Sequence, residues 1–295
     1  MEEEESCIKN SVDADVWSPI IVSLKTSMSL IHVKHDVIKR ILHQTYIYKK
    51  YDKVLLNIVV LNEIYKEPCF IKWLREEYAD IIVIKYVMYD WGNITNIVEA
   101  IEYIDDINSS VTRLTSCDPP YPCETRIIYC EDNVVYPKTM VEMLSLVTEV
   151  DSDNAIWGSI GFNITNMNVV LQKSHGTNVE VLESYGGIIV RLGTFHDDFL
   201  EYLHDLHEGN KKNLFLLSET SDIVISNYLS KHNHPKKIVN MSNKNYAFDC
   251  IWSNIQTCSD KTSIMKSRNE VWDNYMDAIY LLAGWKELYL KMITT

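Results

Sequence analysis

The sequence lacks the features that mark membrane, secreted and zinc-binding proteins. No apolar run reaches the roughly 18 residues that a transmembrane helix needs. The N-terminal segment Met1–Glu5 is acidic, whereas a secretory signal peptide begins with basic residues. The seven cysteines include no C-x-x-C pair with zinc spacing, which favours reduced thiols. We therefore expect a soluble, cytoplasmic protein without a membrane span.

Basic charge is also scarce. The chain has 28 Lys and Arg residues against 41 Asp and Glu residues, and a formal net charge of −13. Binding to nucleic acid depends on basic side chains that neutralise phosphates, so we expect no nucleic-acid partner. A small nucleotide remains compatible with this charge, because it contacts few groups and a bound cation can change the local electrostatics.

Linker-like composition is absent as well. The nine glycines and seven prolines are scattered over 295 residues, and no Ser/Gly-rich or Pro-rich run separates two regions. Hydrophobic residues make up 46% of the chain, which is enough for a large core. We predict a flexible acidic tail over residues 1–18 and a single domain over residues 19–295.

Hydrophobic periodicity predicts alternating strands and helices. Short β-branched runs indicate strands at 20–24, 54–60, 81–84 and 126–130, with amphipathic helices at 33–42, 68–79 and 94–104 between them. This alternation is typical of an α/β fold with a mainly parallel sheet. Short strands within 155–182 predict a small antiparallel hairpin, followed by helices at 195–207, 222–232 and 269–292.

The end of the fourth predicted strand carries the most informative polar residues. Consecutive oxygen-bearing side chains follow the apolar run there, namely Glu131, Asp132 and Asn133. Mg²⁺ and Mn²⁺ prefer carboxylate and amide oxygens together with substrate phosphate, so this strand end is a candidate site for a cation and a diphosphate. The alternative is a polar turn after a buried strand, with Pro137 at the start of a helix.

The segment IIYCEDNVVYP resembles the aspartate-rich strand end of glycosyltransferases with the GT-A fold. It is similar in particular to a family of glycosyltransferases from microbes and large DNA viruses. Further segments match this family in the same order: SLKT at 23–26, YDWGNITN at 89–96, SYGG at 184–187 and SDIVISNYL at 221–229.

The resemblance implies a GT-A-like fold and an enzyme that moves a sugar from a nucleoside-diphosphate sugar to a hydroxyl of a glycan, a protein or a small acceptor. It implies Mn²⁺ or Mg²⁺ held by Glu131, Asp132 and Asn133. Asp222 would be the general base of an inverting displacement, although an Asp at a helix start is also a common N-cap. The residues implied to bind the nucleotide sugar are Thr26, Asp90, Gly92, Thr95, Asn96, Gly186 and Gly187.

The chain departs from the family pattern at several of these positions. Glu131 and Asn133 replace two of three aspartates, Asn96 replaces a lysine, and Ser221 replaces the first of two late aspartates. These departures favour an alternative: a catalytically degenerate protein that binds a nucleotide sugar or a partner protein without turnover. A third alternative is a metal-dependent hydrolase or nuclease that uses the same acidic strand end, but the net charge disfavours a nucleic-acid substrate.

Overall fold

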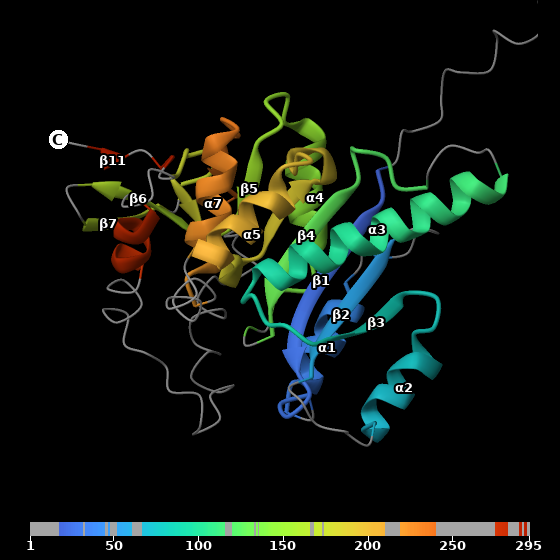
Figure 1. Cartoon of the computed structure of the whole chain (residues 1–295). Coiled ribbons are helices and arrows are strands. Elements are labelled where there is room, and N and C mark those ends of the chain that lie inside the picture. The colour runs from blue at the N-terminus through green and yellow to red at the C-terminus, as the bar shows by residue number, and fades with distance from the viewer. Residues whose placement is uncertain are drawn as a thin grey trace, which may run out of the picture.

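A seven-stranded mixed sheet lies at the centre of the protein in a computed structural model (Figure 1). The strand order is β10-β5-β9-β4-β1-β2-β3. The structure describes residues 18–31, 33–44, 47, 52–60, 67–115, 120–132, 134, 136–165, 168–172, 174–209, 219–239, 275–282, 289–290 and 292–293. The predicted tail, apart from residue 18, lies outside this described part, and the single domain over 19–295 stays a prediction.

The strands on one side of the sheet run parallel. β1 pairs in parallel with both β2 and β4, and β2 pairs in parallel with β3. β9 is inserted antiparallel between β4 and β5, and β10 pairs in parallel with β5. The bounds of these strands are β1 (Ile20–Ser27), β2 (Lys53–Val59), β3 (Ile82–Val87), β4 (Arg126–Glu131), β5 (Ile156–Gly158), β9 (Ile188–Arg191) and β10 (Lys236–Ile238).

Helices cover both faces of the sheet, because successive residues of a strand point to opposite sides. In β1, Ile21 packs with residues of α3, α5 and α7, whereas Ile20 and Val22 pack with residues of α1, α2 and α4. Figure 1 shows α3, α5 and α7 on the same face of the sheet. The bounds of these helices are α1 (His35–Leu42), α2 (Cys69–Glu77), α3 (Ile94–Thr115), α4 (Met140–Val150), α5 (Phe199–Gly209) and α7 (Ser221–Lys231).

A smaller sheet lies beside the large one and is largely antiparallel. β6 pairs with β7 and β8 in antiparallel fashion, and β11 pairs with β6 in parallel. Two short 3-10 helices flank β9. The bounds are β6 (Gly161–Thr165), β7 (Asn168–Gln172), β8 (Val181–Leu182), β11 (Met292–Ile293), η1 (Ser184–Gly186) and η2 (Leu192–Thr194).

The predicted α/β class is confirmed: the structure has a mainly parallel mixed sheet with flanking helices and a small antiparallel hairpin. The helix predicted over 269–292 is helical at residues 275–282, but it does not reach residue 292, which belongs to strand β11. In the part of the chain that the structure describes, no helix has the length and apolar character needed to cross a membrane.

Candidate functional site

The candidate site lies at the carboxyl ends of β1 and β4. The chain passes from β1 to β2 and β3 on one side of β1, whereas β4 lies on its other side. Ligands of open α/β sheets bind outside the carboxyl ends of the strands at such a switch point. Lys25 and Glu131 face each other in register across this pair of strands, and Asp132 follows directly. The predicted acidic strand end therefore lies where a ligand site is expected.

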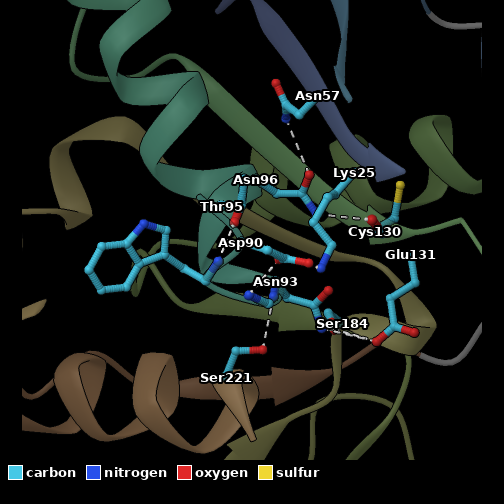
Figure 2. Close-up of polar contacts among 12 residues, drawn as sticks. Lys25, Asn57, Asp90, Asn93, Thr95, Asn96, Cys130, Glu131, Ser184 and Ser221 are labelled. Carbon is cyan, nitrogen blue, oxygen red and sulfur yellow. Dashed lines mark hydrogen bonds and ion pairs between the residues drawn. The ribbon is translucent and has the colours of Figure 1, made fainter. Parts of the chain in front are cut away.

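A polar cluster connects Glu131 to the buried Asp222 through Ser184, and Figure 2 shows the contact between Ser184 and Glu131. The Ser184 hydroxyl lies 3.0 Å from Glu131 Oε1 and 3.2 Å from Asp222 Oδ2. The Ser184 backbone N–H also donates to Asp222 Oδ2, at 3.1 Å. Asn93 Nδ2 donates to Ser184 Oγ at 2.6 Å and to Glu131 Oε1 at 3.0 Å. These contacts bring two acidic side chains from distant segments to one place.

Asp222 has the electrostatic environment of an acid–base group. It lies in the first turn of α7 and is only 5% exposed. Burial, together with the negative charge of Glu131, raises the pKa of Asp222 well above its ordinary value, and the hydrogen bonds from Ser184 oppose this only in part. Its Oδ1 atom is buried and accepts no hydrogen bond from the described residues. Asp222 therefore has one carboxylate oxygen available to take up a proton.

The position of Ser184 depends on the tight turn that follows it. A side chain at Gly186 would collide with Ser159 and would lie 3.0 Å from the backbone nitrogen of Ile160. Ser159 Oγ donates to the Gly186 carbonyl at 2.6 Å. Gly187 has a φ of +78°, which favours glycine. The structure thus places the two predicted nucleotide-sugar-binding glycines in the turn that orients Ser184.

Tyr136 ties this turn to the end of β4. Its hydroxyl accepts a hydrogen bond from the Glu131 backbone N–H at 3.0 Å and donates to the Tyr185 carbonyl at 3.2 Å. The Tyr136 ring is 1% exposed, so its hydroxyl is held in place by the core. The tyrosine of the IIYCEDNVVYP segment thus has a structural role: it fixes Glu131 relative to the turn that contains Ser184.

The loop before α3 forms a second polar edge of the site (Figure 2). Asp90 Oδ1 accepts from Lys25 Nζ at 2.7 Å and from the Gly92 backbone N–H at 2.9 Å. Gly92 has a φ of +66°. The Trp91 backbone N–H donates to Thr95 Oγ1 at 2.9 Å. The turn that starts α3 is therefore built by three of the predicted nucleotide-sugar-binding residues: Asp90, Gly92 and Thr95. Among these three, Asp90 alone has a well exposed side chain, at 41%.

Asn96 is fully buried beneath this loop. Its amide nitrogen donates to the Cys130 carbonyl at 3.2 Å, and its amide oxygen accepts from Asn57 Nδ2 at 3.3 Å. Ser23 Oγ donates to the Asn96 carbonyl at 2.7 Å. These bonds hold the first turn of α3 against β1, β2 and β4. The Asn96 side chain, which the resemblance implies binds the nucleotide sugar, is directed into the protein and bonded to Cys130 and Asn57.

Asp132 has other partners than Glu131. The Asp132 side chain is 20% exposed, and Lys34 Nζ lies 3.9 Å from its Oδ1 atom. Burial raises the pKa of Asp132, while the Lys34 ammonium and the Thr26 hydroxyl favour its charged form. Thr26 is itself buried, at 2% exposure. Asp132 therefore contacts a cationic side chain, whereas Glu131 contacts Ser184 and Asn93.

The described residues do not form the ligand set that a divalent cation requires. Mg²⁺ and Mn²⁺ are held by several oxygen ligands directed at one point. Glu131 and Asp132 are bonded to different partners, and among the residues that the structure describes no group of three or more His, Cys, Asp and Glu side chains is suited to hold a metal. The third predicted ligand, Asn133, lies outside the described residues.

Several residues of the site were not assigned a role from the sequence. Ser184, Asn93, Lys25 and Ser221 all lie in the segments that carry the family resemblance. The Asn93 backbone N–H donates to Ser221 Oγ at 3.0 Å, which joins the start of α3 to the start of α7. The sequence signal that could have identified these four residues is that they are polar and lie next to predicted strand or helix ends. Lys34 lies outside every matched segment, and nothing in the sequence pointed to it.

Neither a family model nor a curated protein sequence matches this chain. Among solved structures, it is similar to GalNAc-T7 with UDP, GalNAc and Mn²⁺, at 9% identity and a TM-score of 0.46, over 77% of this chain and 43% of that one. It is also similar to the mannosyltransferase PcManGT from Pyrobaculum calidifontis in complex with GDP-Man and Mn²⁺, at 7% identity and a TM-score of 0.44, over 91% of this chain and 76% of that one.

A third similar structure is the 2-C-methyl-D-erythritol 4-phosphate cytidylyltransferase of Francisella tularensis, at 12% identity and a TM-score of 0.37, over 81% of this chain and 100% of that one. The chain thus spans less than half the length of GalNAc-T7. At these identities the likeness concerns the fold alone, so we derive the function from the residues of the site.

Proposed function

We propose that this protein is a glycosyltransferase that moves a sugar from a nucleoside-diphosphate sugar to a hydroxyl group of an acceptor. The observation that carries this proposal is the pair formed by the partly buried Glu131 and the buried Asp222, which Ser184 joins near the carboxyl ends of β1 and β4. A carboxyl with a raised pKa is suited to acid–base catalysis near neutral pH. The pair lies where open α/β sheets bind their ligands.

Asp222 acts as the general base in the proposed reaction. The acceptor hydroxyl oxygen attacks the anomeric carbon of the donor, the bond from that carbon to the diphosphate oxygen breaks, and the nucleoside diphosphate leaves. The acceptor proton passes to Asp222 Oδ1, the buried oxygen that has no hydrogen-bond donor among the described residues. Ser184 holds the other oxygen in place. A single displacement of this kind inverts the anomeric configuration.

The nucleotide portion of the donor is proposed to lie beside the loop before α3. Tyr89 is 75% exposed and offers a ring on which a base can stack, and the adjacent Asp90 carboxylate can accept a hydrogen bond from a ribose hydroxyl. Gly92 allows close approach of the backbone. The acceptor, whether a glycan, a protein or a small molecule, would enter on the Asp222 side.

The family resemblance implies Mn²⁺ or Mg²⁺ at Glu131, Asp132 and Asn133, where a cation would neutralise the departing diphosphate, but the two described carboxylates do not share a set of partners. No step of the proposed reaction is assigned to this cation, because these two carboxylates are bonded to different partners and Asp132 lies near Lys34. Nucleotide binding is therefore to be measured both with a divalent cation and without one.

The competing candidate is a protein that binds a nucleotide sugar without turnover. The observation that favours it is the burial of Asp222, which leaves little room for an acceptor unless side chains around it move. This candidate predicts the same nucleotide binding as the enzyme, but no release of nucleoside diphosphate.

The two candidates are separated by a turnover assay. Purified protein is incubated with a panel of UDP-, GDP- and CDP-sugars, and the released nucleoside diphosphate is quantified, with and without a mixture of hydroxyl acceptors. We expect release with at least one donor, and a loss of about 100-fold or more in Asp222→Asn, which is the usual contribution of a general base. Asp205→Asn on the exposed surface of α5 is the control and should retain full activity. Full activity in Asp222→Asn would contradict the assignment.

A further inference from the structure

Two lysines from different elements lie near Asp132 at the switch point of the sheet. Lys25 is on β1, in register with Glu131, and Lys34 directly precedes α1. Lys34 Nζ lies 3.9 Å from Asp132 Oδ1, and Lys25 faces Glu131, the residue directly before Asp132, across β1 and β4. Their side chains are 22% and 12% exposed, so both are largely removed from solvent.

Neither ammonium group is saturated by its protein partners. Lys34 Nζ lies 3.9 Å from Asp132 Oδ1, which is too long for a hydrogen bond, and no described residue accepts a hydrogen bond from it. Lys25 Nζ donates to Asp90 Oδ1 at 2.7 Å and has further N–H groups, since an ammonium carries three. Figure 2 shows the Lys25 ammonium directed toward the Asp90 carboxylate at the edge of the site. A largely buried ammonium without an acceptor is unfavourable until an anion is bound.

We propose that Lys25 and Lys34 bind the diphosphate of the nucleotide directly, so that nucleotide binding does not require a divalent cation. This inference rests on the proposed function, because it assigns the diphosphate of that donor to a particular pair of side chains. Lysine binds phosphate as a point charge with several donors, and two lysines can replace the charge of one divalent ion.

A divalent cation at the same place is disfavoured by these lysines. A cation bound to Asp132 would lie within a few ångströms of the Lys34 ammonium, and like charges repel strongly at a partly buried position. The Oε1 atom of Glu131 is directed at Asn93, which donates to it, and at the Ser184 hydroxyl, rather than at Asp132. The departing diphosphate would be stabilised by the two ammonium groups.

Isothermal titration calorimetry with UDP and GDP tests this inference on the full-length protein. Each nucleotide is titrated once in EDTA and once in Mn²⁺. We expect binding of at least one nucleotide with the same affinity in both buffers. We also expect Lys34→Gln and Lys25→Gln each to weaken that binding by about 10- to 100-fold, the range for a hydrogen bond to a charged group.

Two further variants control for charge and for folding. Lys34→Arg keeps the positive charge and should bind within a few-fold of the wild type. Lys39→Gln, on α1, removes a positive charge at the Trp73 ring and should leave nucleotide binding unchanged. All variants are compared by their unfolding midpoints, so that a misfolded variant is recognised, and Lys34→Met serves as a second neutral variant.

The possible results separate the inference from the proposed function. Binding that occurs in Mn²⁺ and disappears in EDTA would overturn the inference and leave the proposed function intact. Metal-independent binding that is unchanged in both lysine variants would also overturn it. If no nucleotide binds in either buffer, the proposed function itself fails.

Discussion

Asn96→Ala separates a structural role from a ligand-binding role at the start of α3. The substitution removes the donor to the Cys130 carbonyl and the acceptor for the Asn57 amide, and all of these groups are fully buried. A buried polar group that loses its partner costs about 1–3 kcal/mol. The Asn57 amide keeps its 2.9 Å bond to Ser23 Oγ, so it is not left without a partner. We therefore expect the free energy of unfolding to fall by about 2–4 kcal/mol in total. This is a large part of the roughly 5–15 kcal/mol by which folded proteins are stable.

Urea unfolding followed by circular dichroism measures this loss. Ser110→Ala on the exposed surface of the same helix is the control, with an expected change within about 0.5 kcal/mol. If Asn96→Ala is as stable as the wild type but binds nucleotide tenfold more weakly, then Asn96 contacts the ligand and our interpretation of its burial is wrong.

Three further predictions concern stability. Burial and the Glu131 charge raise the pKa of Asp222, so the free energy of unfolding of the wild type should fall as the pH rises toward that pKa. Asp222→Asn should lessen this fall and be more stable than the wild type at pH 8. An equal pH dependence of urea unfolding in both proteins would show that Asp222 is not the source of the fall. Burial opposes the charge of Asp198, but hydrogen bonds from Lys231 and Tyr228 lower its pKa to about 2. Asp198→Asn should therefore cost about 1–2 kcal/mol at pH 6, after allowance for its partial exposure, and this difference should shrink as the pH falls from 4 to 2 in the same assay. Gly186→Ala should cost about 1–3 kcal/mol through overpacking against Ser159, and an unchanged thermal midpoint would show that the turn adapts.

Much of the large sheet could be predicted from periodicity alone. The β-branched runs predicted β1, β2 and β4, because a strand buried on both faces requires a continuous apolar run, and a shorter run predicted part of the edge strand β3. The antiparallel strand β9 was not predicted, since its partners β4 and β5 are set by long-range pairing that no local pattern encodes. The helix α4 was not predicted either, although one interpretation of Pro137 places a helix start near it.

The candidate site was predictable in part. The position of Glu131 and Asp132 at a strand end followed from the apolar run before them, and the structure places both at the carboxyl end of β4. Which side each carboxylate faces could not be read from the sequence, because that depends on neighbours such as Ser184 and Lys34, which lie far away in the chain. The direction of Asn96 was equally open, because spacing alone did not reveal which face of α3 meets the sheet.

The most direct test of the central claim is a crystal structure of the protein with a bound nucleoside diphosphate. We predict that the diphosphate lies at the carboxyl ends of β1 and β4, within hydrogen-bond distance of both Lys25 and Lys34. A nucleotide bound elsewhere, with Lys25 still paired only to Asp90 and no ligand near Glu131, would contradict the account.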